Sequence, residues 1–187
     1  DKEGFPFHAL VRATGISQKT NNEAGGSFGI GKNAAFAISG LHTVFYSTRY
    51  QDKGKEKVLV QGKAILISRN EDGREVRAKG YWGEQGYLAV SDPGRVPGWL
   101  VRSEIGTTVA SVGFDGSRKN WAIEITESLV RNFFAAIHEG RVRFTVGVAQ
   151  GKAFELDSKL LGKLFEHEQL VRAAEESGSI ESFQFSA

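Results

Sequence analysis

The stretch GGSFGIGKNAAF, residues Gly25 to Phe36, places four glycines within seven residues, directly before a lysine and a small apolar segment. Glycine adopts backbone conformations that other residues avoid. Successive N–H groups of such a loop can turn toward one point, and a helix that follows adds positive potential there. The stretch therefore predicts either a phosphate-binding loop before a helix or an ordinary surface loop. The flanking sequence is needed to choose between these two predictions.

The composition excludes several classes of protein. The 187-residue chain has no cysteine, so disulfides, thiolate metal sites and cysteine nucleophiles are excluded. Its net charge of +2 allows nucleic-acid binding but does not indicate it. No apolar run approaches the roughly 18–20 residues of a membrane helix, and the start DKEGFPFHAL is not a signal peptide. We therefore expect a cytoplasmic protein with no membrane partner. Methionine is also absent. We therefore expect either an internal fragment of a longer polypeptide or a sequence from which some residues, such as modified methionines, are missing.

Hydrophobic patterning predicts a strand-rich first part and a helical second part. The turn signal NEDG, residues 70–73, predicts a hairpin, and Asp157 or Ser158 is a plausible N-cap of the last helix, with Gly178 as its stop. The four histidines have no metal-ligand spacing, so no metal-binding residue is predicted. The expected elements are helices over 5–15, 32–40, 121–137 and 156–178, a loop over 16–31, a charged turn over 51–57, and strands over 41–50, 58–69, 74–83, 106–114 and 141–149.

Three phosphate-binding architectures compete for the glycine-rich stretch. Gly26, Gly31 and Lys32 match the Walker A pattern, but Asn33 replaces the Ser or Thr that holds magnesium, and no buried strand precedes the loop. A G-x-G-x-x-A match beginning at Gly29 fits a dinucleotide fold, and the same missing strand counts against it. A lid loop before a helix N-terminus needs no preceding strand, and from there Lys32 would reach a terminal phosphate.

The same residues resemble the second glycine box of the GHKL ATPase superfamily, which includes gyrase, MutL, the ninety-kilodalton heat-shock chaperones, histidine kinases and the MORC proteins. Upstream, Ser17 and Lys19 resemble the Ser-x-Lys element of MutL and MORC proteins. Downstream, Gly106-Thr107 in EIGTTVASVGF resembles the third box, whose threonine lies by the adenine in the family. The resemblance covers about residues 5–114 and is nearest to prokaryotic MORC-like or MutL-like ATPases of DNA-handling and phage-defence systems.

This resemblance implies an α/β domain (an α+β sandwich) of the Bergerat type, with a mixed, mostly antiparallel sheet and helices on one face. The implied domains are an ATP-binding domain over 1–117, lacking its N-terminal part, and an αβα extension over 118–187 that begins a transducer or linker region. ATP and Mg²⁺ are the implied cofactors, and closure of the lid over ATP would drive formation of a homodimer. The implied nucleotide-binding residues are Ser17, Lys19, Gly26, Ser27, Phe28, Gly29, Ile30, Gly31, Lys32, Asn33 and Thr107.

The chain departs from the family pattern at its start. Family members carry an N-terminal helix with a general-base glutamate and a magnesium-binding asparagine, followed by a D-x-G-x-G box. Neither is present, and both would precede Asp1. No catalytic residue is therefore assigned, and ATP hydrolysis is expected only if these elements belong to the full polypeptide.

Two alternatives stay open beside the ATPase. One is a degenerate, non-catalytic module for nucleotide binding or dimerisation. The other is a histidine kinase. Two absences count against it, since the lid lacks the usual G-L-G-L-type ending and the sequence shows no phosphoacceptor helix. The sequence does not choose among DNA, a partner nuclease and a protein client.

Overall fold

Two compact units make up the chain, Asp1–Asp115 and Gly116–Ala187. The division lies two residues before the expected one, which followed residue 117. No helix among the described residues is long and apolar enough to cross a membrane. The structure is a computed structural model that describes residues 6–12, 30–76, 78–117, 120–147, 154–164 and 166–176.

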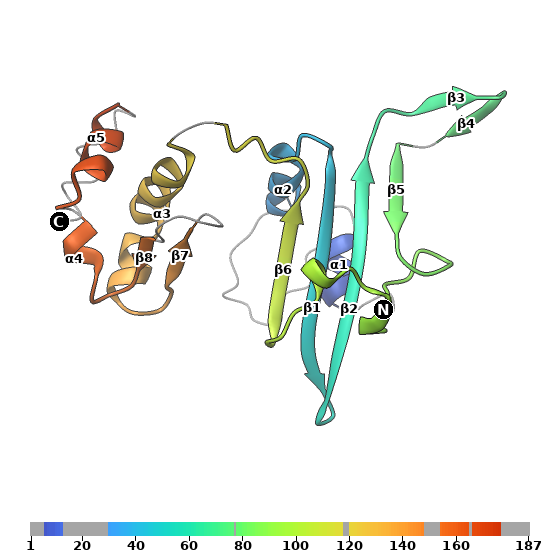
Figure 1. Ribbon diagram of the computed structural model, residues 1–187, viewed down its shortest axis with the longest axis horizontal. Coiled ribbons are helices and arrows are strands. Elements are labelled where there is room, and N and C mark those ends of the chain that lie inside the picture. Colours follow the sequence, from blue (N-terminus) through green and yellow to red (C-terminus); the bar gives the residue numbers. More distant parts are fainter. Residues whose placement is uncertain are drawn as a thin grey trace. The chain divides into compact units, whose positions relative to one another are not determined.

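The first unit is built on a four-stranded sheet with the strand order β5-β2-β1-β6 (Figure 1). All three strand pairings are antiparallel, which confirms the α+β class with a mostly antiparallel sheet. β1 and β2 form the long central pair, and β6 lies at one edge of the described sheet. The strands are β1 (Thr43–Asp52), β2 (Lys55–Ile65), β5 (Lys79–Trp82) and β6 (Gly106–Ser111).

Two tight turns fix the hairpins of this unit. Lys53-Gly54 joins β1 to β2, and Asp72-Gly73 joins β3 (Arg69–Glu71) to β4 (Arg74–Val76). Both residues of each turn have positive φ, as a two-residue hairpin loop of type I′ requires. The hairpin at NEDG is thereby confirmed. The charged turn expected over 51–57 is shorter than predicted, because the strands run on to Asp52 and restart at Lys55.

Helices cover one face of the sheet. These are α1 (Pro6–Val11) and α2 (Ala34–Ala37), the latter preceded by the 3₁₀ turn η1 (Ile30–Asn33). Pro6 stands at the first helical position, where its missing N–H costs nothing. The helix expected over 32–40 is thus a single α-helical turn. Under these helices lie Phe7, Val11, Phe36, Val44, Tyr46, Leu59 and Ala89.

The opposite face is covered by irregular chain. This segment contains two 3₁₀ turns, η2 (Pro93–Arg95) and η3 (Gly98–Leu100), and Val90 forms an isolated bridge with Val60 on β2. Helices therefore lie on one face, as expected, while a Pro- and Gly-rich segment closes the other. The buried residues there are Val58, Val60, Val90, Val96 and Leu100.

The second unit packs helices around a small hairpin. The long amphipathic helix is confirmed as α3 (Trp121–His138), and it ends at Gly140, which has φ +69°. Its buried face joins a core with the hairpin and the last two helices. The remaining elements are β7 (Phe144–Val146), β8 (Phe154–Leu156), α4 (Leu161–Leu164) and α5 (Glu168–Glu176).

The αβα pattern expected for this unit is wrong in two respects. A second strand, β8, pairs antiparallel with β7. The single helix expected over 156–178 divides into α4 and α5. Asp157 directly follows β8, and its Oδ1 accepts hydrogen bonds from the backbone N–H groups of Lys159 and Leu160, each 2.8 Å away. The predicted capping aspartate therefore accepts backbone N–H groups directly before the shorter α4. The expected stop at Gly178 lies outside the described residues.

Candidate functional site

The candidate nucleotide-binding residues fall into a part that the structure describes and a part that it does not. The described part is η1, which forms the end of the glycine-rich box, together with Thr107 on β6. The others lie outside the described residues, namely Ser17, Lys19, Gly26, Ser27, Phe28 and Gly29.

The end of the glycine-rich box is exposed. Gly31 lies on the surface, and a Cβ placed there would have no atom within 4 Å. Asn33 precedes α2 but makes no side-chain capping bond. Because the macrodipole sums over aligned peptide units, the single turn of α2 adds little positive potential. Any phosphate held here would depend on the backbone N–H groups of the loop more than on the helix.

α2 is anchored to β6 and β1 by two serine hydroxyls. Ser111 Oγ donates to the carbonyl of Ala35 at 2.7 Å. Ser39 Oγ lies 2.6 Å from the carbonyl of Val112 and accepts the N–H of Thr43 at 2.9 Å. These bonds fix the helix that follows the glycine-rich box over the carboxyl end of β6.

Thr107 lies at the other end of β6. Its Oγ1 is 3.0 Å from Oγ1 of Thr48, its partner in the β1–β6 pairing, and Thr48 Oγ1 lies 3.2 Å from the carbonyl of Gly106. Thr107 itself is exposed. Thr48 could not be found from the sequence, because only the strand register reveals that it faces Thr107.

Thr107 and α2 share one face of the sheet. Alternation along β6 puts Thr107, Val109 and Ser111 on the same side, and Ser111 is the residue that bonds α2. Val109 between them is 46% exposed. Four residues of strand span about 13 Å. In the part of the chain that the structure describes, Thr107 and α2, the helix that follows the glycine-rich box, thus lie at two ends of β6, with the half-exposed Val109 between them.

Lys63 is a buried lysine that the sequence analysis missed. Its side chain is 7% exposed, and Nζ donates to the carbonyl of Val11 at 2.9 Å. Nζ also lies 5.8 Å from the ring centroid of Phe36 and 6.0 Å from that of Tyr81. Its one sequence signal is a lysine inside the apolar run VLVQGKAI.

Tyr46 lies on this face as well, 2% exposed, directly opposite Val109. Burial raises the pKa of its hydroxyl, because the ionised form would lose its hydration.

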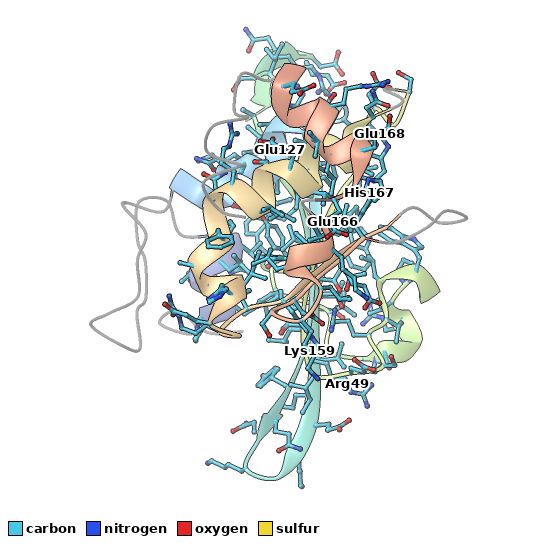
Figure 2. The ribbon with its side chains drawn as sticks, turned by 90° about the vertical axis from the view of Figure 1, so that its left-hand side faces the viewer. Arg49, Glu127, Lys159, Glu166, His167 and Glu168 are labelled. Carbon is cyan, nitrogen blue, oxygen red and sulfur yellow. The ribbon has the colours of Figure 1, made fainter. Side chains whose placement is uncertain are left out.

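A polar network holds the irregular segment against the opposite face. Arg49 on β1 pairs with Glu56 on β2, and its Nη1 donates to the carbonyl of Arg102 at 2.9 Å. Arg102 in turn donates to Thr108 on β6. Figure 2 labels Arg49 near the end of the long β1–β2 pair. A cavity of about 380 Å³ opens beside Arg49 and Glu56, and no predicted site residue lines it.

In the second unit, Figure 2 labels Glu127 on α3, Glu166 and His167 before α5, and Glu168 at the start of α5. Glu127 is 4% exposed, with an oxygen 3.7 Å from Arg131 Nε. A separate cavity of about 450 Å³ is lined by Arg141, Arg143 and Lys159 with the turn at Asp157. In the part of the chain that the structure describes, no three His, Asp or Glu side chains are grouped to hold a metal ion.

Comparison of the chain with protein-family models, with curated proteins and with solved structures gave no significant match.

Proposed function

We propose that this chain binds ATP, with the phosphates held by the glycine-rich loop and the adenine end held at Thr107. The observation that carries the proposal is the shared sheet face. α2, which directly follows the glycine-rich box and is fixed by the Ser111–Ala35 bond, and the exposed hydroxyl of Thr107 lie at two ends of β6 on one side of the sheet. The exposed strip at Val109 between them offers an apolar surface to a base.

The loop supplies the charge stabilisation that a nucleotide needs. Backbone N–H groups of residues 29–32 would neutralise the β- and γ-phosphates, and Lys19 or Lys32 would add a point charge. Closure of the loop over ATP would convert the nucleotide state into a change of shape, and we propose that this closure promotes dimerisation.

Hydrolysis also needs a base or water-orienting group and a metal ion. We assign neither role to a residue of this chain. The proposed reaction is Mg²⁺-dependent hydrolysis of ATP where the polypeptide supplies that base, in a DNA-handling or phage-defence system of the kind that the MORC-like resemblance implies.

A second candidate is a non-catalytic module for partner binding. Two exposed indoles favour it. Trp82 and Trp99, 38% and 64% exposed, both meet the ring of Phe45 edge-on, at 5.7 and 5.5 Å between centroids. Exposed aromatic side chains are enriched at protein interfaces. This surface lies on the opposite side of the sheet from Thr107, so the two functions are separable by mutation.

Photolabelling with 8-azido-ATP tests the proposed placement of the base. We expect the label on the tryptic peptide Ser103–Arg118, which contains Thr107, with labelling suppressed by unlabelled ATP. The peptide that follows Lys79 and carries Trp82 is the internal control and should stay unlabelled. Labelling that ATP does not suppress, or label confined to other peptides, would contradict the proposal.

A further inference from the structure

Lys63 touches the chain on both sides of the glycine-rich loop. Val11, whose carbonyl accepts from Nζ at 2.9 Å, ends α1 before the loop, and Phe36, whose ring centroid lies 5.8 Å from Nζ, belongs to α2 after it. The sequence between these two residues contains the whole glycine-rich box. One side chain from the central strand β2 therefore meets both stems of the loop.

Three groups close to Nζ of Lys63 favour the charged form of its side chain. A buried ammonium is costly unless it is paired or hydrogen-bonded. Here the carbonyl of Val11, at the end of α1, accepts a hydrogen bond from Nζ, and two aromatic rings, Phe36 and Tyr81, lie within about 6 Å of Nζ. Each neighbour favours the charged form, and each belongs to a different element. The charge therefore stabilises the mutual position of α1, α2 and the sheet.

The two stems also share one hydrophobic core. Phe7 and Val11 are buried under α1, and Phe36 is buried under α2. The hydrogen bonds of Ser39 and Ser111 tie α2 to the sheet, but they do not reach α1. Lys63 adds a polar contact to each stem, through the carbonyl of Val11 on α1 and the ring of Phe36 on α2.

We propose that Lys63 is a positioning residue that clamps the base of the glycine-rich loop, and through it sets the affinity for the nucleotide. The second part rests on the proposed function, because it requires that the loop binds ATP. The first part does not depend on that function, since the contacts of Lys63 with Val11 and Phe36 form without nucleotide.

Limited trypsin cleavage after Lys19, without nucleotide, tests the clamp. Lys63→Met keeps the apolar stem but removes the charge and the donor. We expect cleavage about tenfold faster than in the wild type, because opening of the loop base no longer breaks a charge-assisted hydrogen bond. Lys63→Arg should restore most of the protection. Lys57→Met is the matched control, since Lys57 lies on the same strand and its Nζ forms an exposed ion pair with Asp52.

Titration of the same variants with a non-hydrolysable ATP analogue and Mg²⁺ tests the second part. We expect weaker binding for Lys63→Met, rescue by Lys63→Arg, and no change for Lys57→Met. If cleavage rises while the wild type binds no analogue, the proposed function fails and the clamp stands. If cleavage after Lys19 is unchanged in Lys63→Met, the clamp is overturned whatever the affinity.

Should Lys63→Met fail to fold, Phe36→Leu takes its place. This change removes one ring from the ammonium and keeps an apolar side chain. Its control is Phe114→Leu, at a phenylalanine that is 42% exposed. Faster cleavage after Lys19 in Phe36→Leu alone supports the clamp, and equal rates in the two variants overturn it.

Discussion

The hydroxyl of Ser111 on β6 donates to the carbonyl of Ala35 on α2 at 2.7 Å, although 76 residues separate them in sequence. This bond joins α2, the helix that follows the glycine-rich box, to the strand that begins with Gly106-Thr107. It holds α2 on the face of the sheet that also carries Thr107.

Replacing Thr107 by valine should weaken nucleotide binding and leave the fold intact. Valine keeps the β-branched shape that suits a strand but loses the hydroxyl. Loss of one neutral hydrogen bond predicts roughly three- to tenfold weaker affinity for an ATP analogue, measured by fluorescence titration. Thr108→Val is the matched control, because Thr108 faces the opposite side of the sheet and accepts from Arg102. Equal effects in the two variants would count against an adenine site at Thr107.

Ser39→Ala should destabilise the first unit. Ser39 is 3% exposed and joins the end of α2 to Thr43 and Val112. Its removal leaves the Thr43 N–H without this acceptor, at a cost of about 1–3 kcal/mol. Urea unfolding should show a lower midpoint with an unchanged m value. Ser68→Ala, at an exposed serine, is the control, and a midpoint shift no larger than that control would disprove the role of Ser39.

Gly62→Ala should also be destabilising, through overpacking. A Cβ at Gly62 would lie 2.7 Å from Cε1 of Phe45 and 3.1 Å from Cβ of Trp82. Such a clash costs about 1–3 kcal/mol. At Gly80 on the neighbouring strand the nearest atom to an added Cβ is 4.0 Å away, so Gly80→Ala is the matched control. Thermal unfolding of the two variants should separate them, and equal midpoints would refute the close packing of Phe45 on Gly62.

The burial of Tyr46 predicts a loss of stability in alkali. Burial raises the pKa of Tyr46 in the folded state, while in the unfolded state it stays near 10. The stabilisation that the buried, protonated Tyr46 hydroxyl gives the folded state is therefore complete below about pH 10. It declines as the pH rises through the folded-state pKa, by at most about 1.4 kcal/mol per pH unit. Tyr46→Phe has no proton to lose. Urea unfolding at about pH 8 and pH 11 should give a smaller pH effect for the variant, and identical effects would contradict the assignment.

Several elements were predictable because their signals are local. Asp72-Gly73 determines a hairpin turn through its own backbone preferences, and the apolar spacing from Trp121 predicts α3 up to its stop at Gly140. In each case the physical cause lies within a few residues of the feature.

The features that were missed depend on distant parts of the chain. β8 is three residues long, too short for an alternating pattern, and it exists because β7 pairs with it. The burial of Lys63 follows from the register of β2 and from the positions of α1 and α2, and Thr48 becomes part of the site only through its pairing with Thr107. Such relations follow from tertiary packing, which no local pattern contains.

The most direct test of the account is a calorimetric titration of the full polypeptide with a non-hydrolysable ATP analogue and Mg²⁺, beside Gly31→Val and Gly98→Val. An added Cβ has no atom within 4 Å at either glycine, so both variants should fold. The account predicts saturable binding of one analogue per chain, lost in Gly31→Val and kept in Gly98→Val. No saturable binding to a wild-type protein shown to be folded, or full affinity in Gly31→Val, would contradict it.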